Sequence, residues 1–212
     1  MDEEFTQKTY AEFAVKFTCA RNIAGALLAN CAQARNRSSG YNVYYQIYGR
    51  TKKYSSAMKK CEAKGVAKTE RGIARLKDIA GLRVALAYKD DIPKARQDIL
   101  DTFPGATEKK VKKNSGYDAL HMYVKVQVPI SGGDCEDVLV EIQIVTVIMD
   151  DWSKRQHPDY KKDVKNSEIG KIYRRMAELY REQEELYMAL RDEGVYYTES
   201  IPTCSQDVII YL

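Results

Sequence analysis

The sequence lacks the features of secreted, disulfide-stabilised and zinc-binding proteins. Its cysteines are odd in number, scattered and without a C-x-x-C pair, which argues against a disulfide framework and a zinc site. They are Cys19, Cys31, Cys61, Cys135 and Cys204. The first residues, MDEEFTQ, are acidic where a secretory signal is basic, and the apolar stretch NIAGALLANC is too short to cross a bilayer. We therefore expect a cytoplasmic protein that does not enter a membrane.

Internal repeats, low-complexity tracts and interdomain linkers are also missing from the sequence. The chain has 212 residues, of which 44% are hydrophobic and 30% are charged, as is ordinary for a globular protein. This composition predicts one compact domain overall. We divide it into an N-terminal helical segment at 1–40, a core at 41–163, and a long helix with a tail at 164–212.

Positive charge is concentrated in one part of the chain, although the net charge is only +4. Between Arg50 and Lys77 there are ten Lys or Arg residues and only two acidic residues. Such a patch is typical of proteins that bind a polyanion, such as nucleoside phosphates, nucleic acid or an acidic partner. The alternative is a solvated helix face.

Hydrophobic periodicity predicts an α/β protein of the α+β type. Helical spacing covers 6–34, 51–64, 90–103, 147–156 and 167–192, and strand-like composition covers 41–48, 79–88, 119–128 and 138–146. The turn signal SGGD joins the last two strands as an antiparallel hairpin. We expect a mixed, largely antiparallel sheet of about five strands with packed helices, flanked by N- and C-terminal helices.

Two acidic residues stand out against this pattern. Glu141 interrupts the apolar strand VLVEIQIVT, and a buried carboxylate must be paired, bound to a metal or used in chemistry. Asp78 stands at the start of another strand. Carboxylates beside a cationic segment are typical of sites that bind phosphates and Mg²⁺.

The cationic segment itself has a favourable arrangement for phosphates. Lys52, Ser56 and Lys60 share one face of the helix expected at 51–64, and Arg50 comes shortly before them. A triphosphate can lie along this face. Because the sequence has no Gly-x-x-x-x-Gly-Lys loop, cationic side chains rather than backbone amides would hold the phosphates.

An aromatic residue and a histidine share one face of the first hairpin strand. Tyr117 and His121 are four residues apart, so their side chains point the same way. An exposed aromatic ring beside Gly116 can stack on a purine base. Equally, Tyr117 is one of 16 tyrosines, most of which pack at core edges, and His121 can be a structural histidine.

Four motifs in order resemble the synthetase domain of the RelA/SpoT family, and in particular its small, stand-alone alarmone synthetases. They are GRTKKYSSAMKKCEAKG, LKDIAGLRV, KKNSGYDALH, and VLVEIQIVT followed by MDDWSKRQHPDYK, and they span about 41–163. The resemblance implies a nucleotidyltransferase-like synthetase fold. It also implies a pyrophosphokinase that transfers the β,γ-pyrophosphate of ATP to the ribose 3′-hydroxyl of GDP or GTP with Mg²⁺, giving (p)ppGpp.

The resemblance also assigns roles to individual residues. Those placed near the ATP phosphates are Arg50, Lys52, Ser56, Lys60 and Arg83. Those placed on the acceptor side are Lys113, Tyr117, His121 and Gln143, with Tyr117 stacking on guanine and Gln143 also supporting Glu141. Asp78 would bind Mg²⁺, and Glu141 would be the general base or a shared Mg²⁺ ligand at the acceptor hydroxyl.

The chain also departs from the family pattern. Val145 replaces the arginine of the usual EIQIRT motif, Ser115 stands where many members have Asn, and Asp118 follows Tyr117 where a basic or neutral polar residue is commoner. The acceptor pocket is therefore expected to differ. Neither His121 nor His157 precedes an Asp, so the His-Asp site of the bifunctional members is missing and we expect synthesis without hydrolysis.

Two other functions fit the same residues. One is a toxic relative that pyrophosphorylates adenosine nucleotides or the 3′-end of tRNA, which the basic segment favours. The other is a catalytically idle nucleotide-binding or RNA-binding regulator. The apolar stripes of the terminal helices, together with the homotetramers of the resembled synthetases, also suggest a homo-oligomer, unless both helices pack against the sheet of their own chain.

Overall fold

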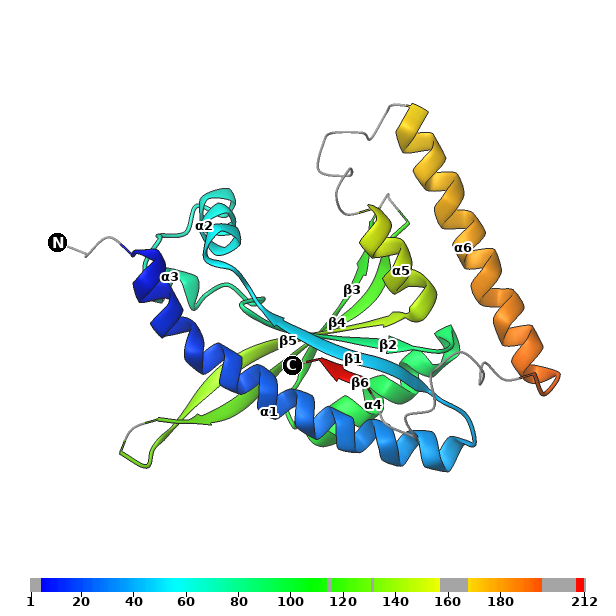
Figure 1. Ribbon diagram of the computed structural model, residues 1–212, viewed down its shortest axis with the longest axis horizontal. Helices are drawn as coiled ribbons and strands as arrows, with labels where there is room; N and C mark the ends of the chain where they lie inside the picture. The colour runs from blue at the N-terminus through cyan, green and yellow to red at the C-terminus, as the bar shows by residue number, and fades with distance from the viewer. Residues whose placement is uncertain (1–4, 114–115, 131, 157–167, 196–208, 212) are drawn as a thin grey trace.

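The computed structural model describes residues 5–113, 116–130, 132–156, 168–195 and 209–211 (Figure 1). Its sheet has the order β3-β4-β5-β2-β1-β6. The strands are β1 (Tyr44–Thr51), β2 (Ala80–Leu86), β3 (Thr107–Lys112), β4 (Asp118–Pro129), β5 (Cys135–Thr146) and β6 (Ile209–Tyr211). Strand β2 pairs in parallel with β5, and β1 with β6, whereas β1–β2, β3–β4 and β4–β5 are antiparallel. The mixed, largely antiparallel sheet with flanking helices is confirmed.

One face of the sheet forms the main hydrophobic core. Alternation along β5 sends Val140, Ile142 and Ile144 to this face, and all three are fully buried. The helices α1 (Gln7–Ser39) and α4 (Ile92–Thr102), the latter preceded by the 3₁₀ helix η1 (Lys89–Asp91), cover it and lie below the sheet in Figure 1. The apolar stripe predicted for the N-terminal helix is therefore core.

The opposite face carries polar side chains and is covered mainly at its ends. Helices α2 (Tyr54–Ala63) and α3 (Glu70–Ile73) follow β1, and α5 (Val147–Gln156) follows β5 directly. The change from β5 to α5 occurs at Thr146, whose Oγ1 accepts a hydrogen bond of 3.0 Å from the backbone nitrogen of Met149. This cap turns the chain back over the polar face.

The long C-terminal helix α6 (Glu168–Asp192) packs on α5 and on the start of β4. A second apolar cluster joins these elements through Tyr117, Ala119, Val145, Met149, Trp152 and Ala177. At the far end of α6, Arg191 makes two hydrogen bonds of 2.7 Å to Asp90. The other side of α6 is different, because it exposes the apolar residues Ile169, Ile172, Leu179, Leu186 and Leu190.

The structure differs from the predicted elements in three details. The basic helix begins at Tyr54 rather than Thr51, because the Lys52 nitrogen is still bonded at 2.8 Å to the Ile79 carbonyl. The stretch TEKKVK, to which no element was assigned, forms β3 despite its Glu and Lys residues, which are depleted in strands, because it pairs with β4 along its whole length. The short helix α3 was not predicted. None of the helices in the described ranges has the length and apolarity of a membrane span.

Candidate active site

The register of the strands brings the predicted polar residues together in two rows on the open face of the sheet. In the first row Tyr123, Glu141, Gly81 and Arg50 lie side by side on β4, β5, β2 and β1. In the second row His121, Gln143, Arg83 and Tyr48 lie side by side on the same strands. Tyr48 and Gln143, which are 95 positions apart in the sequence, thus share one surface.

Glu141 is nearly buried, with 7% of its surface exposed, and its carboxylate lies within hydrogen-bond distance of His121 and Gln143. His121 Nδ1 lies 3.1 Å from Oε1, and Gln143 Nε2 donates to Oε2 at 2.7 Å. Burial alone would raise the pKa of Glu141, but these hydrogen bonds outweigh it and hold the pKa below its usual value. Glu141 is therefore a fixed, ionised carboxylate at neutral pH.

Asp78 lies just before β2 and is paired with two lysines. Lys52 Nζ lies 3.0 Å from Asp78 Oδ2, and Lys60 Nζ donates to the same oxygen. Burial would raise the pKa of Asp78, but the two ammonium groups hold it below its usual value. The negative charge of Asp78 in turn acts to raise the pKa of Glu141, so the two carboxylates lie within electrostatic reach of each other.

The other predicted donor-side residues border this pair. Lys52 precedes α2 instead of lying on it, yet both Lys52 and Lys60 reach Asp78. Ser56 is exposed on α2, one turn before Lys60, and Arg50 is exposed at the end of β1. The predicted cations are therefore present, and Asp78 pairs with two of them, Lys52 and Lys60.

Arg83 is held by other protein groups in this structure. Its Nε and Nη2 donate to Gln143 Oε1 at 3.2 and 2.8 Å, and its Nη1 donates to Asp150 Oδ1 at 2.8 Å and to Ser153 Oγ at 2.6 Å. Gln143 thus links the Arg83 guanidinium to the Glu141 carboxylate. This arrangement fixes Arg83 beside the site, whereas direct contact with ATP stays a prediction.

Asp150 and Tyr48 complete this network and were not among the predicted site residues. The Tyr48 hydroxyl donates to Asp150 Oδ1 at 2.6 Å, and Lys154 Nζ lies 2.7 Å from Asp150 Oδ2. Burial would raise the pKa of Asp150, but hydrogen bonds from Lys154, Tyr48 and Arg83 hold it below its usual value. The position of Asp150 in the quoted motif MDDW was a signal for it, whereas Tyr48 had no sequence signal.

Of the two interpretations of Tyr117, the structure supports packing at a core edge rather than an exposed ring. The residue is 7% exposed and packs in the second apolar cluster beneath α6. Its neighbour Gly116 approaches Ala177 of α6 so closely that a Cβ on Gly116 would lie 2.1 Å from the Ala177 Cβ. Lys113, which is exposed, places its Nζ 5.1 Å from the centroid of the Tyr117 ring. Stacking on guanine stays a prediction, and Ser115 lies outside the described residues, as does His157.

Val145 explains how the departure from the EIQIRT pattern is accommodated. Its side chain is fully buried in the cluster with Tyr117 and Trp152. An apolar residue therefore fills the place where the family pattern has a cation. Asp118 is half-buried, and its Oδ2 lies 3.3 Å from Lys112 Nζ.

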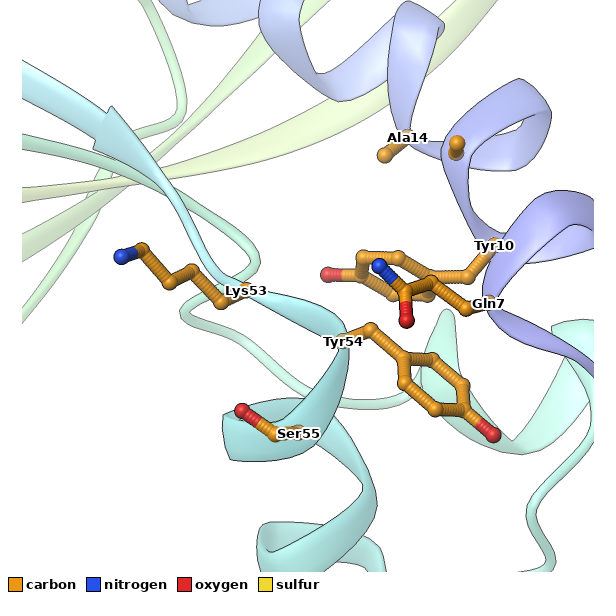
Figure 2. Close-up of a pocket in the computed structure, with 7 residues that line it drawn as sticks. Gln7, Tyr10, Ala14, Lys53, Tyr54 and Ser55 are labelled. Atoms are coloured by element: carbon orange, nitrogen blue, oxygen red, sulfur yellow. The ribbon is translucent and has the colours of Figure 1, made fainter.

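A surface pocket of about 360 Å³ lies next to the donor side, between the first turns of α1 and α2. Figure 2 shows Tyr10 and Tyr54 on one side of it, and Lys53 and Ser55 on the other. The Tyr10 hydroxyl donates to the carbonyl of Lys52, so this pocket adjoins Lys52. It contains no carboxylate and is separate from the Asp78–Glu141 pair.

The described residues contain no group of three or more His, Cys, Asp or Glu that could hold a metal ion by themselves. One observation nevertheless fits a divalent cation. The second oxygen of Asp78, Oδ1, is buried and has no hydrogen-bond partner among the described residues. Mg²⁺ is commonly held by one or two carboxylates together with substrate phosphates, and this pair of acids matches that requirement.

Two known proteins are similar to this chain in sequence. GTP pyrophosphokinase YwaC of Bacillus subtilis is 30% identical over 138 residues, which are 62% of this chain and 65% of YwaC. GTP pyrophosphokinase YjbM of the same organism is 34% identical over 119 residues, 52% of this chain and 54% of YjbM. The aligned regions thus span less than two thirds of each relative.

Solved structures agree on the fold. Small alarmone synthetase 1 from Bacillus subtilis bound to its product pppGpp superposes with a TM-score of 0.77 at 24% identity, covering 88% of this chain and 98% of that one. Its complex with AMPCPP gives 0.74 at 25% identity with the same coverage. A family model described as the region found in RelA/SpoT proteins matches residues 49–165. Since this match covers more than half of the chain, the protein belongs to the RelA/SpoT family.

Proposed function

We propose that the protein is a pyrophosphokinase that transfers the β,γ-pyrophosphate of ATP to the ribose 3′-hydroxyl of GDP or GTP to make (p)ppGpp. The observation that carries this proposal is that Glu141, held on the open face of the sheet, lies within electrostatic reach of Asp78, which pairs with Lys52 and Lys60. The pppGpp and AMPCPP bound to small alarmone synthetase 1 support nucleotides as ligands.

The donor side needs charge neutralisation and alignment more than covalent chemistry. Lys52 and Lys60 are paired with Asp78 in the structure, and we propose that they turn to the ATP phosphates when ATP binds. Arg50 and Ser56 are exposed and free to contribute further hydrogen bonds. Asp78 and Glu141 would hold Mg²⁺, which when bound neutralises charge on the transferred group.

The acceptor side needs a group that accepts the proton of a weakly nucleophilic hydroxyl. Glu141 is ionised and is oriented by His121 and Gln143, so it can take the proton of the 3′-hydroxyl within hydrogen-bond reach. We place guanine on the face of Tyr117 that lies beneath Lys113. The guanine would displace the Lys113 ammonium group toward the acceptor phosphates.

A second candidate function has its own supporting observation. The cationic residues Lys53, Lys59, Lys64, Arg71 and Arg75 are all exposed, so they can contact phosphates outside the active site. This surface favours the toxic relative that modifies adenosine nucleotides or the 3′-end of tRNA. Salt-sensitive binding of deacylated tRNA would support it over the nucleotide acceptor.

Transfer of label tests the proposal. The protein, MgCl₂ and γ-labelled ATP are incubated separately with GDP, GTP, ADP, ATP and deacylated tRNA. We expect label on GDP or GTP, and we expect the product to persist on longer incubation because no hydrolase site is present in the sequence. Label on tRNA or on an adenosine acceptor would establish the second function. If no acceptor gains label, the proposed transfer is rejected in favour of a catalytically idle nucleotide-binding or RNA-binding regulator.

The Glu141→Gln variant tests the role of the carboxylate. We expect turnover to fall about 100-fold or more, since the shape is kept and the proton acceptor is lost. Glu136→Gln is the matched control, because Glu136 lies on the same strand and pairs with Lys16 at 2.7 Å, away from the site. Equal turnover in wild type and Glu141→Gln would reject Glu141 as the base.

A further inference from the structure

Tyr123 faces the catalytic carboxylate, although it was not among the residues that the sequence singled out. It lies on β4 directly opposite Glu141 in the antiparallel ladder, two residues after His121, and therefore on the same face as both. Residues that are directly opposite in such a ladder have Cβ atoms about 5 Å apart. The Tyr123 side chain is thus a neighbour of Glu141, and it is only half-buried.

The surroundings of Tyr123 are charged on both sides. Lys77 Nζ lies 5.1 Å from the centroid of its ring, and Lys77 directly precedes Asp78 in the chain. Burial raises the pKa of Tyr123 to about 12, and the charge of Glu141, a hydrogen bond to it and the charge of Asp78 add to this shift. A tyrosine hydroxyl carries its proton at neutral pH and acts as a donor toward a carboxylate.

The neighbours of Glu141 show why such a donor matters. On β2 the residue beside Glu141 is Gly81, which has no side chain to hold the carboxylate. A Cβ at Gly81 would make only van der Waals contact with the carbonyl oxygens of Arg50 and Glu141, at 3.8 and 3.9 Å, so β2 offers no polar partner to the carboxylate at this position. Support must come from the opposite side, where β4 supplies Tyr123 and His121, and from Gln143 on β5 itself.

We propose that Tyr123 is a positioning residue of the transfer site, which donates its hydroxyl to Glu141 and holds that carboxylate toward Asp78, while Lys77 fixes the ring. This inference rests on the proposed pyrophosphate transfer for its catalytic consequence. The contact between Tyr123 and Glu141 can be tested without that transfer. The alternative role for Tyr123 is ordinary packing of an aromatic residue on a strand.

Steady-state kinetics of Tyr123→Phe test the positioning role. The variant keeps the ring and removes only the hydroxyl. We expect kcat to fall about tenfold, because a hydrogen bond to a charged group is lost, while KM for both nucleotides changes less than about twofold. Tyr180→Phe is the matched control, since its hydroxyl bonds to Asp151 at 3.2 Å on α5, and it should keep wild-type kcat.

A double-mutant cycle shows whether Tyr123 acts through Glu141. In the Glu141→Gln background, adding Tyr123→Phe should lower the residual kcat less than about twofold, because there is no carboxylate left to position. An equal tenfold fall in both backgrounds would mean a general structural role and would overturn the inference. Wild-type kcat in Tyr123→Phe would also overturn it.

The same cycle measured by urea unfolding separates this inference from the proposed function. We expect the two substitutions to be coupled in the unfolding equilibrium constant by about fivefold, since they remove the two partners of one contact. If the wild type labels no acceptor, the proposed transfer fails, whereas coupling in unfolding still supports the contact. Additive effects on unfolding would overturn the contact even in an active enzyme.

Discussion

The contact between Gly116 and α6 makes a quantitative prediction for the variant Gly116→Ala. Gly116 has a φ of 88°, a left-handed conformation that residues with a Cβ rarely adopt. A Cβ there would also lie 2.1 Å from the Ala177 Cβ and 3.5 Å from its Cα. The variant must therefore bear both backbone strain and a collision with α6.

These two costs can be separated with a second glycine. The left-handed conformation costs an alanine about 1–2 kcal/mol, and overpacking costs about 1–3 kcal/mol, so Gly116→Ala should lose about 2–5 kcal/mol of stability. Gly105 has a φ of 83° and no atom within 4 Å of a Cβ. Gly105→Ala should therefore lose only the backbone part, about 1–2 kcal/mol.

Trp152 provides the assay. It is the only tryptophan in the chain, and it is fully buried. The centroid of its ring lies 5.7 Å from that of Tyr173 and 5.3 Å from that of Tyr180, both on α6. Urea unfolding followed by Trp152 fluorescence gives the stability of each variant. We expect the native emission of Gly116→Ala to shift to longer wavelength as α6 separates from the sheet, and that of Gly105→Ala to stay unchanged.

A compensating substitution strengthens the test. Adding Ala177→Gly to Gly116→Ala removes the colliding methyl group, so part of the lost stability and the native emission should return. If Gly116→Ala and Gly105→Ala lose the same stability with identical native emission, then α6 does not rest on Gly116 and the explanation for the burial of Tyr117 is refuted.

Two further predictions concern α6. Burial raises the pKa of Glu184, so the folded protein binds this proton more tightly than the unfolded chain, and the stability it contributes is lost as the pH rises above 4.5 through the folded pKa. As the pH increases from 4 to 8, the free energy of unfolding of Glu184→Gln should therefore rise relative to that of the wild type. A difference between the two proteins that does not change with pH in this range would contradict this. If the exposed stripe of α6 joins copies of the chain, Leu179→Glu with Leu186→Glu should reduce the mass measured by light scattering to that of the 24.2 kDa monomer. The control variant Val15→Glu with Leu27→Glu on α1 should leave the measured mass unchanged. A wild type that is already monomeric would contradict the proposal that α6 joins copies of the chain.

Many of the residues that the structure brings together in the candidate site could be predicted from residue types. Glu141 could be singled out because burying a carboxylate in an apolar strand costs free energy unless the carboxylate is paired, binds a metal or takes part in chemistry. The structure places it beside His121 and Gln143. Lys52 and Lys60 were found as cations, although the predicted helix boundary was wrong. Tyr123 was missed because a tyrosine in a strand is ordinary until the residue opposite it is known.

By itself the sequence determined which side chains share a face, since alternation along a strand is a local property of the backbone. It therefore separated the apolar face of β5 from the face that carries Glu141 and Gln143. Tertiary structure alone decided which faces meet. Arg83 beside Gln143, Tyr123 beside Glu141, and Tyr117 beneath Ala177 depend on strand register and helix docking, which join residues far apart in sequence through contacts that no local pattern encodes.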